Sequence, residues 1–145
     1  MKFTDIDTER QDIIINELNN HLVISHDLLK KDKCILPLLI IKGETKEETQ
    51  LISLQPQDGL IDVDKAFDAA IAKLKTTQFK ISIFSYSTKM SFDGKQYIDA
   101  IKSVIIFKEG LTAVIFSPYV IKGLFNKKVY IGKSTMEQVI ENIFE

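Results

Sequence analysis

The stretch that decides the fold runs from Phe79 to Ile131 and alternates strand-forming segments with turn residues. It begins Phe79-Lys80-Ile81-Ser82-Ile83-Phe84-Ser85-Tyr86, then passes through a polar tip into a long segment of isoleucine and valine. A Glu109-Gly110 turn follows, and then more valine, isoleucine and phenylalanine. β-Branched and aromatic segments joined by tight turns are typical of antiparallel strands. The stretch therefore predicts an antiparallel meander.

The register of the first hairpin is predicted from Asp93-Gly94, because a type I′ turn needs positive φ at both central positions. With these residues as the loop, Ile101 is expected opposite Tyr86, and Val104 opposite Ile83. The two expected faces are Phe84, Tyr86, Asp99, Ile101 and Ile105 on one side, and Ile81, Ile83, Val104 and Ile106 on the other.

The second hairpin, at Glu109-Gly110, repeats this pattern. It places Ala113 and Ile115 on the second face and Val114 and Phe116 on the first. The middle strand is thus apolar on both sides, whereas a sheet with one face in water alternates apolar and polar residues. We expect both faces to be covered, by helices of the chain or by a partner subunit. A one-residue slip in either turn would exchange the faces without changing that expectation.

The rest of the chain predicts helices and further strands around this meander. A possible capping box at Thr8 and Gln11 begins the first helix, and Asp62 is the expected N-cap of the second. The expected elements are a helix over about Asp7–Leu29, strands over Cys34–Lys42 and Thr49–Leu54, a helix over about Val63–Thr76, the meander, a strand over Phe125–Ile131, and a short helix from Ser134 or Thr135 through Phe144. This order, α-β-β-α-β-β-β-β-α, predicts an α+β fold with helices packed on a mostly antiparallel sheet, in a single domain spanning residues 1–145.

The composition excludes several classes of protein. The net charge of −1 argues against a nucleic-acid binder that works by bulk charge. Cys34 is the single cysteine, so one chain can form neither an internal disulfide nor a cysteine zinc site, and we expect a buried structural thiol. No apolar run approaches the ~18 residues of a membrane span, and no signal peptide is recognisable. We expect a cytoplasmic protein without membrane contact.

Metal ligands are not predicted. His21 and His26 lie five positions apart, whereas two helical ligands need a spacing of three or four. The carboxylates of Asp58, Asp62, Asp64 and Asp68 gather at the start of the second helix, where capping and the helix dipole account for them. We expect neither a metal nor a cofactor.

Two polar surfaces remain as candidate sites. The hairpin tip could bind a ligand or partner, or could be a solvated hairpin that protrudes from the core. Its candidate residues, taken with a tyrosine of the next strand, are Tyr86, Lys89, Asp93, Lys95, Asp99 and Tyr119. The second surface combines Lys122, Lys127, Lys128 and Lys133 with Phe125 and Tyr130. Such a cluster can bind single-stranded nucleic acid, but lysines on a terminal strand also protect a sheet edge, and we prefer the latter interpretation.

Two segments resemble a group of uncharacterised bacterial domain proteins. They are Ile35-Leu36-Pro37-Leu38-Leu39-Ile40 after a helix, and Phe92-Asp93-Gly94-Lys95-Gln96-Tyr97-Ile98-Asp99-Ala100-Ile101. Ser117-Pro118-Tyr119 stands where that group often ends a strand. The resemblance implies the fold and a bacterial source, and the group has no assigned activity. Roadblock-like and profilin-like modules and type III secretion chaperones have a similar order of elements, which is an analogy of fold alone.

These observations favour a binding or interaction module without catalytic activity, such as an immunity protein or a chaperone-like protein. Its partner would be another protein or a second copy of the chain, and not nucleic acid. The alternative is a small hydrolase or transferase whose site is the Ser85–Asp99 tip together with Tyr119. Phosphate loops, nucleotide-binding fingerprints and nucleophile elbows are absent from the sequence.

Overall fold

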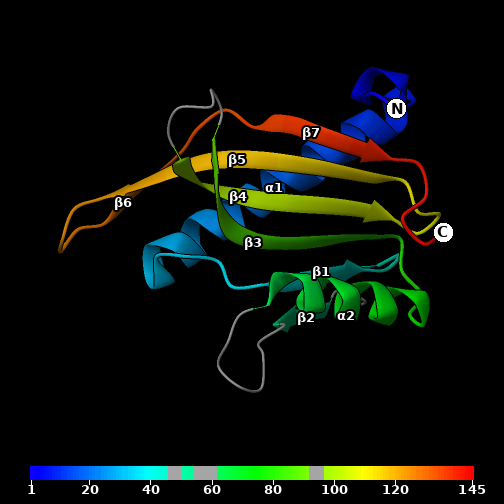
Figure 1. Ribbon diagram of the computed structural model, residues 1–145, viewed down its shortest axis with the longest axis horizontal. Coiled ribbons are helices and arrows are strands. Elements are labelled where there is room, and N and C mark those ends of the chain that lie inside the picture. Colours follow the sequence, from blue (N-terminus) through cyan, green and yellow to red (C-terminus); the bar gives the residue numbers. More distant parts are fainter. Residues whose placement is uncertain (46–49, 54–61, 92–96) are drawn as a thin grey trace.

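The computed structural model describes residues 1–45, 50–53, 62–91 and 97–145, and shows an α+β fold, as predicted (Figure 1). The elements are η1 Phe3–Asp5, α1 Thr8–Asp32, β1 Leu38–Lys42, β2 Gln50–Ser53, α2 Val63–Lys75, β3 Ile81–Ser91, β4 Tyr97–Phe107, β5 Thr112–Lys122, β6 Lys128–Ile131 and β7 Thr135–Ile140. In these ranges all strand pairs are antiparallel, in the order β2-β1-β3-β4-β5-β6. β7 also pairs with β5, so β6 and β7 share one edge of that strand.

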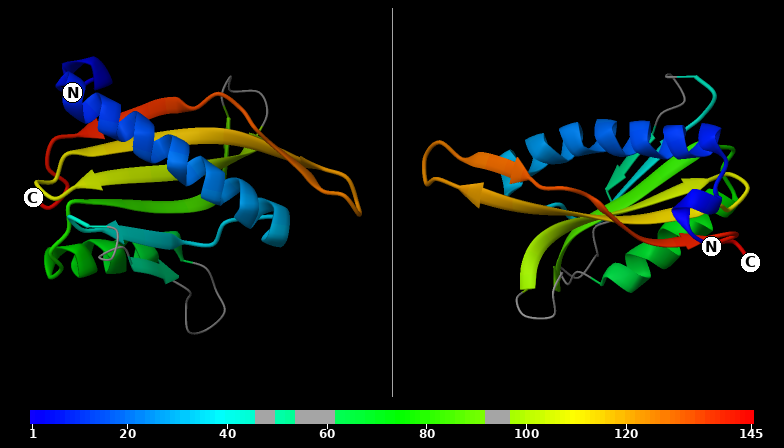
Figure 2. Two further views of the ribbon diagram at one scale, coloured as in Figure 1. Left: turned by 180° about the vertical axis from the view of Figure 1, so that it is seen from behind. Right: turned by 90° about the horizontal axis from the view of Figure 1, so that it is seen from above.

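The sheet lies between the two helices, with α1 across one face and α2 on the other (Figure 2). The core beneath α1 joins Ile14 and Leu18 of the helix to Ile83, Ile105 and Ile115 of the sheet. The core beneath α2 joins Ala70 and Leu74 to another set of sheet residues, which are Leu39, Phe84, Val104, Val114 and Phe116. Of the two expected ways to cover the faces, the chain therefore supplies one helix of its own on each side.

Both helix N-termini are capped by an aspartate. Asp62 accepts a 3.1 Å hydrogen bond from the Lys65 amide, as predicted for α2. The predicted Thr8 cap of α1 is wrong, because Asp7 takes that position and accepts from the Arg10 amide at 3.1 Å. α1 also runs beyond Leu29 to Asp32.

The predicted register of the meander is wrong by one residue in each hairpin. Ile83 lies opposite Ile105 rather than Val104, and Ile105 lies opposite Ala113. The two shifts cancel, so β5 has the predicted orientation relative to β3, and only the side chains of β4 exchange faces. The cause in the second hairpin is a longer loop, in which the Phe107 amide donates to the Leu111 carbonyl at 2.8 Å. In the first hairpin Ser91 pairs with Tyr97, and Asp93-Gly94 lies outside the described residues.

The predicted C-terminal helix is wrong, because Thr135–Ile140 forms strand β7. The side chain of Val139 enters the core beneath α1, while Ile143 and Phe144 pack against the core beneath α2. β7 also gives hydrogen-bond partners to the edge of β5 from Thr112 to Phe116, which would otherwise be open to pairing with another chain. Pairing with the open edge of β5 therefore determines the structure of this segment, although the spacing of its apolar residues is that of a helix.

The predicted strand from Cys34 also begins later than expected. β1 starts at Leu38, directly after Pro37, whose missing amide hydrogen suits the position before a strand. Cys34 is exposed, so the expectation of a buried thiol is wrong.

Gly110 should be sensitive to substitution, because its φ of 103° is unfavourable for other residues and an added Cβ would collide with the Asn142 side chain. We expect Gly110→Ala to lower the free energy of unfolding by about 1–2 kcal/mol. Urea denaturation measures this change. Gly132→Ala is the control, because Gly132 has no positive φ. Equal stability of the Gly110→Ala variant and the unmodified protein would contradict the turn geometry.

Candidate binding groove

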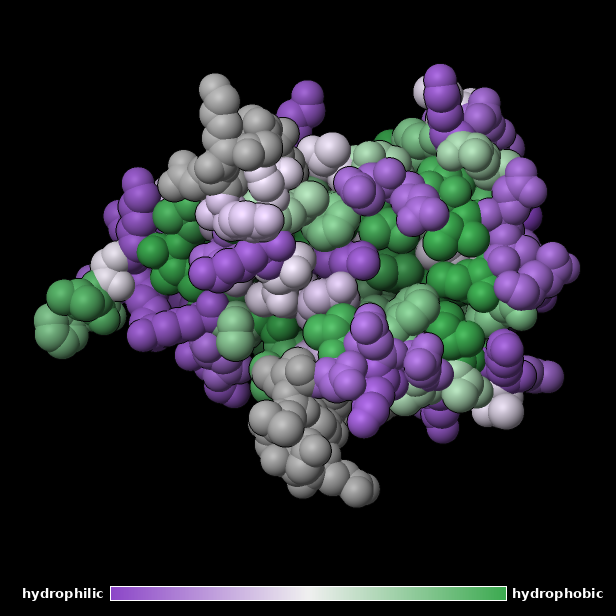
Figure 3. Space-filling view, viewed as in Figure 1, coloured by the Kyte–Doolittle hydropathy of each residue, from purple (hydrophilic) through white to green (hydrophobic). Residues whose placement is uncertain are grey.

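An open groove of about 360 Å³ lies on the face of the sheet that α2 covers only in part. Its floor is apolar and comes from three adjacent strands, with Phe84 of β3, Val104 of β4, and Val114 and Phe116 of β5. α2 forms one wall, and β7 with the C-terminal segment forms the other. Figure 3 views this face and shows hydrophobic side chains gathered between β7 and α2. The groove therefore has the apolar lining that binding pockets commonly show.

Lys102 is the charged group at the floor of this groove. It lies opposite Tyr86 on β3 and Phe116 on β5, since the three residues align in register. Its ammonium lies 5.8 Å from the centre of the Tyr86 ring and 5.7 Å from that of Phe116. Aromatic faces attract a cation at such distances. In the described part of the chain no carboxylate forms an ion pair with Lys102, so its charge remains available to an anionic group.

The walls add acidic groups around this lysine. Asp64 stands at the start of α2 and Glu137 on β7, and both side chains are exposed. The lining thus combines an apolar floor, one cation held between two rings, and carboxylates at the rim. Such a surface can orient a partner that carries both an apolar side chain and an anion.

The predicted site residues do not gather at one place. Tyr86 lines the groove, whereas Tyr119 lies on the opposite face and packs with Leu29 of α1. Lys89 and Asp99 lie opposite each other near the end of the β3–β4 hairpin. Asp93 and Lys95 lie outside the described residues.

Tyr119 has a structural environment. Its hydroxyl donates to Ser87 Oγ at 3.1 Å, and Ser87 Oγ also accepts from the Ile35 amide at 2.7 Å. Burial raises the pKa of the Tyr119 hydroxyl, and the nearby charge of Asp99 raises it further, against the opposing effect of the Ser87 hydrogen bond. Tyr119 is therefore neutral at physiological pH and ties β5 to the segment before β1.

A histidine–serine pair that the sequence pattern does not reveal lies beneath α1. His21 Nε2 and Ser85 Oγ share a hydrogen bond of 2.8 Å, and both side chains are fully buried. Burial, together with the positive charge of Lys42, lowers the pKa of His21 to about 4. The imidazole is therefore neutral at physiological pH.

This pair lacks two features of a nucleophilic site. Catalytic triads have a third group that orients the second ring nitrogen, but His21 Nδ1 has no hydrogen-bond partner in the described structure. The groove lining also contains neither His21 nor Ser85. The pair joins α1 to β3 as a buried polar contact.

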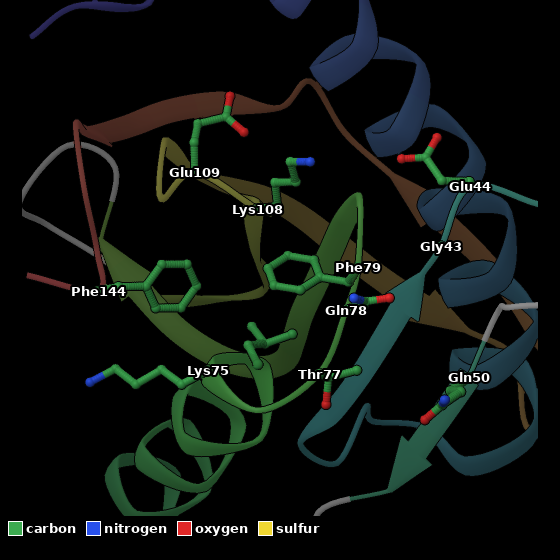
Figure 4. Close-up of a pocket in the computed structure, with 11 residues that line it drawn as sticks. Gly43, Glu44, Gln50, Lys75, Thr77, Gln78, Phe79, Lys108, Glu109 and Phe144 are labelled. Atoms are coloured by element: carbon green, nitrogen blue, oxygen red, sulfur yellow. The ribbon is translucent and has the colours of Figure 1, made fainter.

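A larger open cleft of about 950 Å³ lies at the end of the sheet near the C-terminus of α2 (Figure 4). The rings of Phe79 and Phe144 meet edge to face, with centroids 6.4 Å apart. Lys75 and Lys108 lie at its border, as does Glu109, which pairs with Arg10. The lining comes mostly from turns and the ends of elements, so it is a less rigid scaffold than the strand floor of the groove.

Metal clusters and membrane-spanning helices are not found in the described ranges. No three histidine, cysteine, aspartate or glutamate side chains there are close enough together to hold a metal ion. No helix there has both the length and the apolar character needed to cross a bilayer. Comparisons with family models, with curated proteins and with solved structures found no significant match. The function is therefore inferred from the geometry of this chain.

Because His21 is buried in its neutral form, we expect the folded protein to lose stability as the pH falls. Because its folded pKa of about 4 lies below the ordinary value of 6.5, the unfolded chain binds the proton first as pH falls. The contribution of neutral His21 to the free energy of unfolding is complete above about pH 6.5 and is lost progressively toward pH 4. We expect this residue alone to lower the free energy of unfolding by about 2 kcal/mol between about pH 7 and about pH 5.

Urea denaturation across this pH range tests the expectation. His21→Gln keeps a donor for Ser85 without a titrating ring, so it should show a flatter pH dependence. His26→Gln is the control for the loss of a histidine from α1, because the His26 side chain is 45% exposed and does not contact Ser85. The same pH dependence in the unmodified protein and in His21→Gln would contradict the assignment.

Proposed function

We propose that this chain is a binding module without a catalytic role, and that its groove takes a segment of another protein that pairs an apolar side chain with a carboxylate. The observation that carries this proposal is Lys102, held between Tyr86 and Phe116 on an apolar floor. An apolar side chain would cover the floor, and the carboxylate would approach the lysine ammonium. In a partly buried setting such a charge pair is stronger than on an open surface.

The shape of the groove supports a peptide segment as the occupant. It is open to solvent and lies between two separate walls, α2 and β7, so a chain can enter without passing through a narrow mouth. The acidic rim at Asp64 and Glu137 favours segments whose flanking residues are neutral or basic. Immunity proteins and secretion chaperones hold partners on surfaces of this general kind, and a cytoplasmic module of that type is our proposal for the biological role. The exposed thiol of Cys34 fits a reducing compartment.

A binding role also fits the chemistry of the described side chains better than catalysis does. The histidine–serine pair is buried away from the groove, and the tip residues proposed for a hydrolase are divided between two faces of the sheet. The groove supplies an anchor and a charge, which are features of recognition.

The first test uses a defined probe, anilinonaphthalene sulfonate, which combines aromatic rings with an anion. We expect its fluorescence to rise on binding, and Lys102→Gln to weaken that binding about fivefold to tenfold through loss of the charge pair. Lys65→Gln on the exposed side of α2 is the matched control and should leave the affinity unchanged. The neutral probe phenylnaphthylamine should bind both variants equally.

The second test addresses the partner. A peptide with one phenylalanine and one neighbouring glutamate among neutral residues should bind. The same peptide with lysine in place of the glutamate should bind more weakly, and Phe116→Ser should weaken the binding of the glutamate peptide. A photo-crosslinking residue at Gln138 would then join the natural partner in cells. We expect Lys102→Glu to abolish this crosslinking. Replacement of the partner's carboxylate residue by lysine should restore it, and this result would support the proposal. Peptide binding that is unchanged by Lys102→Gln and by Phe116→Ser would contradict the proposal. Crosslinking of the chain to a second copy of itself would show that the groove serves self-association and does not bind another protein.

A further inference from the structure

The hairpin between β5 and β6 extends beyond the body of the molecule at one end (Figures 1 and 2). We call residues 120–133 the basic arm, because they contain four lysines and no acidic residue in a chain whose net charge is −1. Lys122, Lys128 and Lys133 are exposed, and Lys127 is partly exposed. The rest of the chain has 15 lysine and arginine residues against 20 aspartate and glutamate residues, a net charge of −5, so the arm is a local concentration of positive charge on an otherwise acidic protein.

The tip of the basic arm is apolar. Leu124 is 89% exposed and Phe125 is 98% exposed, and Figure 3 shows a separate hydrophobic patch at this end. The turn itself is well defined, because Gly123 has a φ of 98° and an added Cβ would lie 2.5 Å from the Asn126 carbonyl oxygen. Hairpin tips usually carry turn-forming polar residues. The backbone here instead places two adjacent apolar side chains at the most distant point of the arm.

The base of the arm is anchored in the core. Val129 of β6 packs with Tyr119 and with Leu29 of α1. The Lys122 ammonium lies 5.9 Å from the centre of the Tyr130 ring, which links the two strands of the arm. The last turn of α1 and its cap bring Lys30, Lys31 and Lys33 to the same end of the molecule (Figure 2). The arm is thus a supported projection with further lysines at its base.

We propose that the basic arm is a membrane-contact site that binds an anionic lipid surface. Leu124 and Phe125 enter the boundary between headgroups and acyl chains, and the lysines behind them meet the lipid phosphates. Apolar burial and attraction to anionic lipids add to each other in surface binding of this kind. The expectation of no membrane contact was drawn from the lack of a spanning segment, which surface contact does not require.

Edge protection and nucleic-acid binding each account for only part of the arm. Protection of an edge strand explains lysines on β6 but not an apolar tip, since exposed apolar residues at an edge promote unwanted association. Binding of single-stranded nucleic acid uses aromatic rings on which bases stack. Leu124 offers no ring, and the Tyr130 ring has the Lys122 ammonium over it. An anionic lipid surface uses both the aliphatic and the aromatic side chain together with the lysines.

The absence of tryptophan from the chain allows a direct test. Phe125→Trp places the chain's single tryptophan at the tip. With vesicles of equal parts phosphatidylcholine and phosphatidylserine, its emission should shift to the blue and the protein should sediment with the vesicles. Vesicles of phosphatidylcholine alone should give little binding, and high salt should reverse the binding to anionic vesicles. Val23→Trp on α1, where the native side chain is 66% exposed, is the control and should show no shift.

Substitutions then separate the two contributions. The double variant Leu124→Ser/Phe125→Ser should lose at least about tenfold in vesicle affinity, because the apolar insertion is removed. Lys127→Gln/Lys128→Gln should lose a similar factor and depend less on salt. Lys65→Gln/Lys73→Gln on α2 changes the net charge equally and should bind as the unmodified protein does. The exposed tip residues should not affect folding, and circular dichroism checks this.

Failure of the vesicles to bind the protein or to shift the tip tryptophan would overturn the proposal. Quenching of the tip tryptophan by a single-stranded oligonucleotide, without any effect of vesicles, would assign the arm to nucleic acid instead. Binding of anilinonaphthalene sulfonate in the groove should be unchanged in the tip variants, so the result is independent of the proposed groove.

Discussion

The pairing of β3 with β4 determines which side chains reach each face of the sheet. Ile83 lies opposite Ile105, and this register places Lys102 beside Tyr86 and Phe116. A shift of one residue along β4 would bring Lys102 beneath α1 and turn Ile101 toward α2. The same pairing therefore provides the apolar core beneath α1 and the charged centre of the groove beside α2. Both the stability of the sheet and the proposed binding chemistry depend on it.

The two faces are covered unequally because the two helices differ in length. α1 has 25 residues and crosses the sheet diagonally, from the apolar core near η1 to the cluster around Leu29 (Figure 2). His21 and Ser25 lie between these two regions and are buried, and His21 contacts Ser85 of the sheet. α2 has 13 residues and lies nearer β1 and β2 (Figure 1). The part of the other face that α2 does not cover is the groove, so the groove follows from the architecture.

The sequence predicted the elements that have strong local signals. Asp62 before an amphipathic segment indicated the start of α2, and the β-branched segments after Phe79 indicated the meander. The predicted register assumes the shortest loop, and it is wrong in the second hairpin because the hydrogen bond from the Phe107 amide to the Leu111 carbonyl encloses a longer one. The sequence predicts a helix for the final segment because its apolar residues have helical spacing. Its pairing with the edge of β5 as strand β7 is a tertiary contact that leaves no local signal in the sequence.

The candidate site was harder to predict than the fold. The sequence indicates Tyr86 as a site residue but groups it with Tyr119, which lies on the opposite face of the sheet. Lys102 is not among the predicted site residues, although a single lysine within the apolar segment Ile101–Phe107 is a signal for it. Its significance depends on which face it occupies, and that depends on a register which one sequence left undetermined. Similarly, the sequence favours edge protection for the arm lysines. The exposure of Leu124 and Phe125, which points to another role, depends on how far the hairpin extends from the molecule and is not visible in the sequence.

The most direct test of the central claim is a nuclear Overhauser measurement on the isotope-labelled protein in solution. The account predicts contacts between the side-chain methylene protons of Lys102 and the ring protons of both Tyr86 and Phe116. It also predicts upfield shifts of those methylene protons from the two rings. Contacts of Ile101 with the Tyr86 ring, with Lys102 instead near residues of α1, would show the alternative register. That result would contradict both the groove and the function proposed for it.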